Sequence, residues 1–200
     1  VYADLPFMSA SAAFYASSGK DLIDWLWSYK TNRYSPVNTD QMVITGFEMQ
    51  ADFPLEKTLG LRSPLYDIRL GYNTMNVSKS TDDSLSKYYN IKHKLTLSVR
   101  HKLFRHLGAS WHLCYQDRAG SYIRFDETDQ TYFATAYKPF LLLDGNIFLE
   151  SRYIDLFIEV TNLLNTRYAD AGSVIQPGRW ITAGIKVTVQ DRQKPTPEDK

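Results

Sequence analysis

Residues 180–189 read Trp-Ile-Thr-Ala-Gly-Ile-Lys-Val-Thr-Val, so that an apolar aliphatic side chain stands at every second position. Successive side chains of a β-strand point to opposite faces of a sheet. The pattern therefore predicts a strand with one face in an apolar medium and the other face in a polar one. Residues 155–161 show the same alternation and predict a second strand of this kind.

Alternation with a period of two recurs along most of the chain. Several of the predicted strands reach ten residues or more, whereas strands of soluble sheets usually have ~5–6. A tilted strand that crosses a bilayer needs ~9–11 residues. The predicted strands lie at 8–17, 21–29, 41–54, 64–76, 92–103, 108–118, 137–150, 153–164 and 179–189.

The two faces of these strands differ in chemistry. Placing Lys or Arg on the lipid face of a membrane barrel costs ~2–4 kcal/mol at the middle of the bilayer. We therefore expect the apolar positions to face lipid, namely Ile68, Leu70, Leu95, Leu97, Leu156, Ile158, Ile181 and Ile185. The opposite face should line a polar lumen with Arg69, Arg100, Glu159, Thr182 and Lys186.

The connections between the predicted strands alternate between short and long. The short ones are at 18–20, 55–63, 104–107 and 151–152, and the long ones are at 30–40, 77–91, 119–136 and 165–178. Outer-membrane barrels have short periplasmic turns and long extracellular loops. We therefore expect an all-β, antiparallel transmembrane barrel over residues 1–189, with the four long loops on one side of the sheet. Residues 190–200 carry two prolines and six charges and predict a disordered polar tail.

Composition excludes several classes of protein. Hydrophobic residues make up 44% of the chain, but no run approaches the ~20 apolar residues of a membrane-spanning helix. The net charge is +1 without a basic block, which argues against a nucleic-acid partner. Cys114 is the only cysteine, so no internal disulfide can form. Val1-Tyr2-Ala3-Asp4 is not the start of a signal peptide, and we expect an N-terminal portion outside this sequence.

Residues that could carry chemistry are few. His112 and Cys114 are two positions apart and share one face of a strand, but no third metal ligand accompanies them. The acidic loop residues Asp82, Asp83, Asp126, Glu127 and Asp129 do not have the spacing of a calcium loop. We find no nucleophile elbow, phosphate loop or dinucleotide fingerprint, so we expect no enzyme and no cofactor.

The C-terminal third carries motifs that resemble those of TonB-dependent receptors. Asn162-Leu163-Leu164-Asn165 resembles the motif that opens the last external loop in that family, and Pro177-Gly178-Arg179 is similar to the start of its final strand. Ile44-Thr45-Gly46-Phe47-Glu48 and Tyr137-Lys138-Pro139-Phe140 resemble further family strands, and Asp21-Leu22-Ile23-Asp24-Trp25 looks like a strand of vitamin B12 receptors. The chain departs from the family in one respect, because the last strand ends at Val189 rather than at a terminal aromatic residue.

The resemblance implies the C-terminal nine strands of a barrel of about 22 strands around a plug. It implies a receptor in the outer membrane of a Gram-negative bacterium that imports a scarce nutrient, either cobalamin or an iron chelate, with cobalamin favoured by the Leu-Ile-Asp-Trp strand. The implied partners are outer-membrane lipid, the plug and remaining strands of the same receptor, TonB acting through the plug, and a surface lipoprotein over the barrel.

Aromatic residues of the long loops are candidates for contact with a ring-bearing ligand. The candidate residues are Tyr34, Tyr88, Tyr89, Tyr122, Arg124, Phe125, Tyr132 and Phe133. Aromatic residues near strand ends can instead form the girdle at the membrane–water boundary. We assign Trp25, Trp27, Tyr29, Trp111 and Tyr137 to this girdle.

Two other classes of protein fit part of the pattern. A soluble β-sandwich or a lipocalin-like ligand-binding protein would explain the alternation, but it would explain neither the sorting of loops by length nor the terminal motifs. An adhesin-type barrel without a plug is a third possibility.

Overall fold

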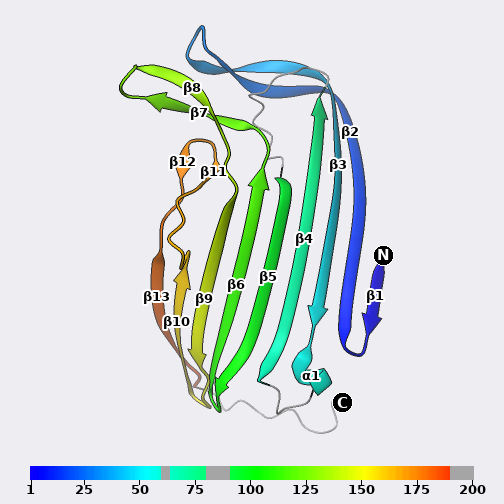
Figure 1. Cartoon of the computed structure of the whole chain (residues 1–200), viewed down its shortest axis with the longest axis vertical. Coiled ribbons are helices and arrows are strands. Elements are labelled where there is room, and N and C mark those ends of the chain that lie inside the picture. The colour runs from blue at the N-terminus through cyan, green and yellow to red at the C-terminus, as the bar shows by residue number, and fades with distance from the viewer. Residues whose placement is uncertain (60–63, 80–90, 190–200) are drawn as a thin grey trace.

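The computed structural model describes residues 1–59, 64–79 and 91–189, and most of them lie in one long, curved antiparallel sheet (Figure 1). Each strand pairs with its sequence neighbours in the sheet, and β6 pairs with β9. The sheet is open, with β1 and β13 at its two edges. In order across the sheet the strands are β1 (Tyr2–Leu5), β2 (Met8–Ser28), β3 (Arg33–Phe53), β4 (Leu65–Lys79), β5 (Ile91–Phe104), β6 (Leu107–Arg118), β9 (Phe140–Leu149), β10 (Ile154–Thr161) and β13 (Trp180–Val187).

The remaining elements lie in the connections between these strands. β7 (Ser121–Asp126) and β8 (Thr131–Ala136) form one hairpin, and β11 (Ala169–Ala171) and β12 (Val174–Ile175) form another. The short helix α1 (Leu55–Leu59) follows β3. Within the described part of the chain, no helix has the length and apolar character needed to cross a membrane.

The first predicted turn is wrong. Residues 18–20 do not reverse the chain, because β2 runs unbroken from Met8 to Ser28 and pairs with β3 along its whole length. The local irregularity is Asp21, which has a φ of 54° and remains within the strand. Residues 30–40 are accordingly not an irregular loop, since β3 begins at Arg33 and a tight turn precedes it.

The number of strands in the sheet is nevertheless nine. The predicted strands at 8–17 and 21–29 merge into β2, and the prediction omitted the short edge strand β1. The strand ends also shift, because 137–139 and 162–164 lie outside β9 and β10. The predicted polar tail at 190–200 lies outside the described residues.

The register sorts the predicted residues onto the two faces as expected. Directly opposite residues of an antiparallel pair share a face. Leu156 pairs with Ile185, and Leu97 pairs with both Leu70 and Leu113. Following the pairs across the sheet places all eight predicted lipid-facing residues on one face. Ile158 is 55% exposed and Ile181 66% exposed, so no second sheet covers this face there, as it would in a sandwich.

Charged and polar pairs occupy the opposite face. Asp52 accepts a hydrogen bond from Arg69, its cross-strand neighbour, and another from Gln50. Arg100 forms an ion pair with Glu150, and the hydroxyl of Ser98 lies 2.9 Å from Nδ1 of His112. These contacts match the polar lumen face that the alternation predicts.

Aromatic rings on the polar face lie over cross-strand glycines. Tyr15 stands opposite Gly46, and a β-carbon at position 46 would overlap the Tyr15 ring. Phe157 covers Gly184 in the same way. The close approach of ring and backbone explains why both positions carry glycine.

The two ends of the sheet carry different connections (Figure 1). α1 and the short turns after β5 and β9 lie at one end. The β7–β8 and β11–β12 hairpins and the turn of the β2–β3 hairpin lie at the other. Two of the predicted long connections, 119–136 and 165–178, therefore share one side, as expected.

Candidate ligand-binding site

Two hairpins extend beyond the sheet at its long-loop end. β3 pairs with β4 from Met42 onward, and among the described residues the outer halves of β2 and β3 pair only with each other. This extension bends across the end of the sheet toward the β7–β8 hairpin (Figure 1). The structure thereby brings together side chains that are about 100 positions apart in the sequence.

Four rings from these hairpins form a cluster, which we call the external aromatic cluster. Trp27 and Tyr34 are cross-strand neighbours with ring centroids 5.0 Å apart and planes at 73°. Tyr132 of β8 packs 4.8 Å from Trp27, and Phe125 of β7 lies 5.0 Å from Tyr132. Such edge and tilted contacts add ~0.5–1.5 kcal/mol beyond the area they bury. The cluster therefore fixes the two hairpins against each other.

The phenol of Tyr34 is affected by these surroundings. Burial raises the pKa of Tyr34 above its ordinary value of 10.0, and the nearby Tyr137 raises this pKa further. Tyr34 therefore remains a neutral hydroxyl group at physiological pH. It contributes a ring and an uncharged hydrogen-bonding group to the external aromatic cluster.

The β7–β8 hairpin presents different side chains on its two faces. Phe125 pairs with Tyr132, which packs against Trp27, whereas the Tyr122 and Arg124 positions alternate with Phe125 along the strand. Tyr122 packs 5.1 Å from Tyr137. The predicted site residues of this hairpin are thus divided between the external aromatic cluster and the opposite face.

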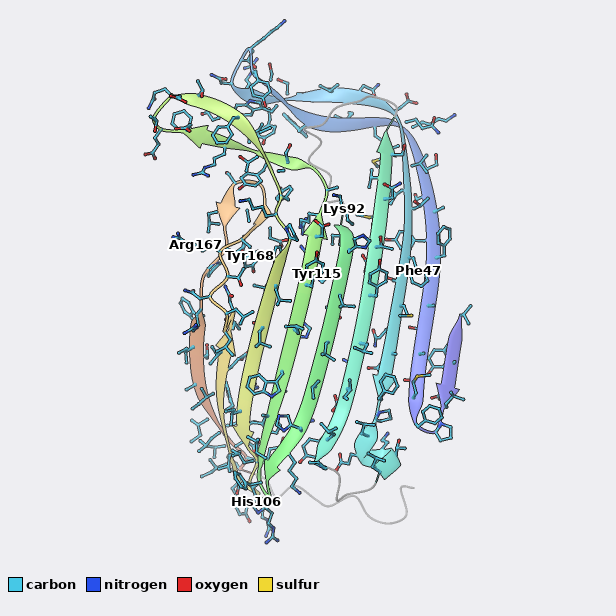
Figure 2. The ribbon with its side chains drawn as sticks, viewed as in Figure 1. Phe47, Lys92, His106, Tyr115, Arg167 and Tyr168 are labelled. Atoms are coloured by element: carbon cyan, nitrogen blue, oxygen red, sulfur yellow. The ribbon has the colours of Figure 1, made fainter. Side chains whose placement is uncertain are left out.

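A cavity of about 540 Å³ lies between this second face and the loop that precedes β13. Its volume is in the range of small-molecule sites. Three cationic side chains and three phenols are among the groups that line it: Arg124, Lys138, Arg167, Tyr122, Tyr137 and Tyr168. Figure 2 shows Arg167 and Tyr168 below the β7–β8 hairpin, toward the long-loop end of the sheet. We call this space the external cavity.

Contacts to the sheet hold the floor of the external cavity in place. The Tyr168 ring packs 4.3 Å from Phe140, and the backbone N–H of Gly172 donates to the Tyr137 hydroxyl at 3.0 Å. Asp170 forms an ion pair with Arg118 at 2.6 Å and accepts a hydrogen bond from Gln116, which is 5% exposed. Burial raises the pKa of Tyr168, and the carboxylate of Asp170 raises it further.

The Asn162-Leu163-Leu164-Asn165 motif anchors the same loop. Asn162 and Asn165 have φ values of 49° and 53°, in the left-handed region that asparagine tolerates. The Asn162 amide donates to the carbonyls of Thr166 and Pro177 and accepts from the Thr166 N–H. The Asn165 amide oxygen accepts the N–H of Arg179 at 3.0 Å. The motif joins the two ends of the loop, and Arg167 and Tyr168 lie between them.

The structure shows where the predicted ligand-binding residues lie, whereas ligand binding by these residues stays a prediction. Tyr34, Phe125 and Tyr132 lie together, whereas Tyr122 and Arg124 line the external cavity. Phe133 pairs with Arg124 and is 39% exposed. Tyr88 and Tyr89 lie outside the described residues.

Other residues of this region were not predicted as site residues. Trp27 was assigned to the girdle, but it is the centre of the external aromatic cluster, because β2 extends past the sheet. Tyr137 likewise contacts Tyr122 through its ring and Gly172 of the β10–β13 loop through its hydroxyl. Arg167 and Tyr168 lie two and three residues after the Asn-Leu-Leu-Asn motif, which is the one sequence signal that pointed to them.

Among residues 1–59, 64–79 and 91–189, no group of three or more His, Cys, Asp and Glu side chains is placed to hold a metal ion. His112 and Cys114 lie on the polar face, as expected, where His112 contacts Ser98.

Comparisons with known proteins agree on one architecture. The chain resembles the FrpB iron transporter from Neisseria meningitidis, with a TM-score of 0.64, 15% identity and coverage of 92% of this chain and 29% of that one. It also resembles the copper transporter OprC, with a TM-score of 0.67, 14% identity, and coverage of 92% and 29%. For the siderophore receptor PirA from Acinetobacter baumannii, the TM-score is 0.59 at 14% identity, with coverage of 93% and 30%. The chain thus spans less than a third of the length of these structures.

No curated protein sequence matches the chain. The model of the TonB-dependent receptor-like β-barrel family matches residues 2–163. This match covers most of the sheet and rules out the soluble sandwich and the lipocalin as descriptions of the fold. The chain therefore belongs to the β-barrel family of TonB-dependent receptors, which are proteins of the Gram-negative outer membrane.

Proposed function

We propose that the chain is part of an active-transport receptor that binds an anionic metal chelate, in the first place an iron chelate, from outside the cell. The observation that carries this proposal is the external cavity, in which three cations and three phenols surround a space of about 540 Å³. Iron, siderophore and copper transport are named for the similar structures. Import would use energy transmitted by TonB.

The chemistry of the external cavity favours a chelate over cobalamin. Arg124, Lys138 and Arg167 supply donors, and none of the described residues that line the cavity is acidic. Charge-assisted hydrogen bonds to carboxylate or phenolate oxygens are stronger than neutral ones. The phenols supply flat faces for aromatic groups of a ligand. The sequence motif that pointed to cobalamin, Asp21 to Trp25, lies in β2 and does not line this cavity.

The external aromatic cluster would form a second contact surface for the same ligand. Tyr34, Phe125 and Tyr132 are each between 36% and 41% exposed, so part of each residue remains accessible. We include Tyr34, Tyr122, Arg124, Phe125, Tyr132 and Phe133 in the proposed site, together with Arg167 and Tyr168.

The partners follow from the family rather than from contacts in this chain. The polar face carries a hollow of about 860 Å³ lined by residues of β1 to β5, including Glu48, Gln50, Asn73 and Lys94. A plug domain of the same receptor, which would couple to TonB, would lie against such a polar face. The remaining strands of the barrel would pair with the open edges at β1 and β13, because unpaired backbone groups are costly in a membrane. A surface lipoprotein stays a further proposed partner.

Ligand binding to the full-length receptor tests the proposal. Quenching of tryptophan fluorescence would be titrated with catecholate and hydroxamate ferric siderophores and with cyanocobalamin. Arg124→Gln and Arg167→Gln should each weaken binding of the preferred chelate about 10- to 100-fold, because hydrogen bonds to charged groups contribute ~1.5–3 kcal/mol. Arg33→Gln, on the β2–β3 hairpin and away from the cavity lining, is the matched control. Equal affinity of both cavity variants and wild type, or binding of cyanocobalamin alone, would contradict the proposal.

A further inference from the structure

Two hydrogen-bond donors on the polar face of β6 bind a carboxylate of the β10–β13 loop. Gln116 and Arg118 are two positions apart, so they share one face of the strand. Both are nearly enclosed, since Gln116 is 5% exposed and the Arg118 side chain 9% exposed. The Gln116 amide donates to Oδ1 of Asp170 at 2.9 Å, and a guanidinium nitrogen of Arg118 lies 2.6 Å from the same oxygen. We call Gln116 and Arg118 the donor pair.

The carboxylate that the donor pair binds belongs to the β11–β12 hairpin. Figure 1 shows this hairpin at the long-loop end of the sheet. Asp170 is the middle residue of β11, and its side chain is 42% exposed. Its neighbour Ala169 and the turn residue Ser173 line the external cavity. Asp170 thus fastens the floor of the external cavity to the sheet, and its side chain remains partly accessible to solvent.

Polar contacts, more than apolar burial, hold the β11–β12 hairpin in this position. β11 has three residues and β12 has two. Val174 and Ile175 are 62% and 59% exposed, so β12 buries little apolar surface. The N–H of Gly172 donates to the Tyr137 hydroxyl at 3.0 Å. Because segments with few buried apolar contacts open at low free energy, the hairpin can leave the sheet while the base of the loop stays anchored.

The donor pair has the chemistry of a carboxylate-binding site. Charge-assisted hydrogen bonds between arginine and a carboxylate are among the stronger hydrogen bonds in proteins. Removing the partner of an enclosed charge is costly, whereas exchanging one carboxylate for another keeps the charges balanced. Departure of Asp170 from Arg118 is therefore favoured when a second carboxylate takes its place.

We propose that the donor pair is an inner subsite for a carboxylate group of the transported chelate, and that Asp170 occupies this subsite until the chelate displaces it. The inference rests on the proposed function and narrows the ligand to iron chelates that carry a free carboxylate. The cations of the external cavity, Arg124, Lys138 and Arg167, bind the chelate first. Lifting of the β11–β12 hairpin then gives the chelate access to the donor pair on the polar face.

Opposite effects of two substitutions test the inference. Full-length receptor would be titrated, by quenching of tryptophan fluorescence, with ferric citrate, which has free carboxylates, and with ferric enterobactin, an anionic chelate without them. Arg118→Gln should weaken ferric citrate binding about 10- to 100-fold, because hydrogen bonds to a charged group are lost. Asp170→Asn should strengthen it about tenfold, because a neutral amide competes less well for Arg118. Both variants should bind ferric enterobactin as wild type does.

A purely structural ion pair would give a different result. Both substitutions would then loosen the hairpin and shift the affinity for ferric citrate in the same direction. Asp129→Asn removes an exposed carboxylate from the β7–β8 turn at the same end of the molecule, and it should leave both affinities unchanged. If Arg118→Gln does not assemble, Arg118→Lys keeps the charge without the planar fork of donors and should still weaken ferric citrate binding.

The results separate this inference from the proposed function. Shifts of the same sign in the Arg118 and Asp170 variants, or an unchanged affinity in Asp170→Asn, would overturn the inference. Absence of ferric citrate binding in both wild type and Asp170→Asn would do the same. The proposed function would stand in these cases if ferric enterobactin binds and Arg124→Gln weakens its binding. Failure of every iron chelate to bind would overturn both.

Discussion

Asn162 should hold the β10–β13 loop closed more than any other single side chain of that loop. It is 6% exposed and forms three side-chain hydrogen bonds to backbone groups, at 2.8, 2.9 and 3.3 Å. Its own N–H donates to Asp144 of β9 at 2.8 Å. Asn162→Ala would remove the three side-chain bonds and place alanine at a φ of 49°.

The cost can be estimated from these contacts. Each buried backbone group that loses its partner costs ~1–3 kcal/mol. The two shorter bonds are the stronger ones, and water can reach part of the loop, so we take the lower end of that range for them. The left-handed backbone adds ~1–2 kcal/mol for a residue with a β-carbon other than asparagine or aspartate. A total of about 3 kcal/mol raises the population of the open loop about 150-fold.

Proteolysis reports this opening, because Arg167 lies within the loop and supplies a trypsin site. Cleavage of a transiently opened segment follows the equilibrium population of the open form when closing is faster than cleavage. Full-length receptor in outer-membrane vesicles would be digested, and peptides ending at Arg167 counted by mass spectrometry. Asn162→Gly keeps the backbone conformation and should show the hydrogen-bond part alone. An increase below threefold in Asn162→Ala, or wild-type rates in Asn162→Gly, would refute this account of the motif.

Three further results are expected. Leu97→Arg, on the apolar face, should lower the free energy of unfolding by ~2–4 kcal/mol in a guanidinium titration, whereas Ser98→Arg on the polar face should lower it much less. Equal losses of unfolding free energy in the two variants would contradict the assigned faces. Because the pKa of Tyr34 is raised in the folded state, the neutral phenol contributes its full stability below the unfolded-state pKa near 10. This contribution is lost as the pH rises through the folded-state pKa. The melting temperature should therefore depend less steeply on pH between pH 9 and 12 in Tyr34→Phe than in wild type. A cysteine at Asp126 should react with an impermeant reagent on intact cells, and a cysteine at Arg105 should not; the reverse result would invert the orientation of the sheet.

The sequence alone predicts the sheet well because alternation is a local property. Side chains two positions apart share a face whatever the strand pairs with, so Ile158 and Ile185 could be assigned to the lipid face before any register was known. Ends of strands are less local. Ser18-Gly19-Lys20 has the composition of a turn, yet β3 continues to pair with β2 on both sides of it, and pairing decides the outcome.

The candidate site was predicted only in part, for a related reason. Loop aromatics can be recognised by type, but which of them meet depends on how far each hairpin extends beyond the sheet. Trp27 is the clearest example. A strand that ended near residue 29 at the membrane boundary would place Trp27 in the aromatic girdle. In the structure β2 and β3 extend past β4, and Trp27 contacts Tyr132 from a hairpin about 100 positions later.

The Asn-Leu-Leu-Asn motif connects the fold to the proposed function. It resembles a family motif, and in the structure Asn162 and Asn165 bind the backbone at both ends of one loop. Arg167 and Tyr168 lie inside that loop, and their positions in the external cavity depend on the anchored ends. Loosening the anchor should therefore weaken chelate binding even though neither asparagine lines the cavity. Asn162→Ala, measured in the same fluorescence titration as Arg167→Gln, should lower affinity for the chelate, and normal affinity with an opened loop would separate the motif from the binding site.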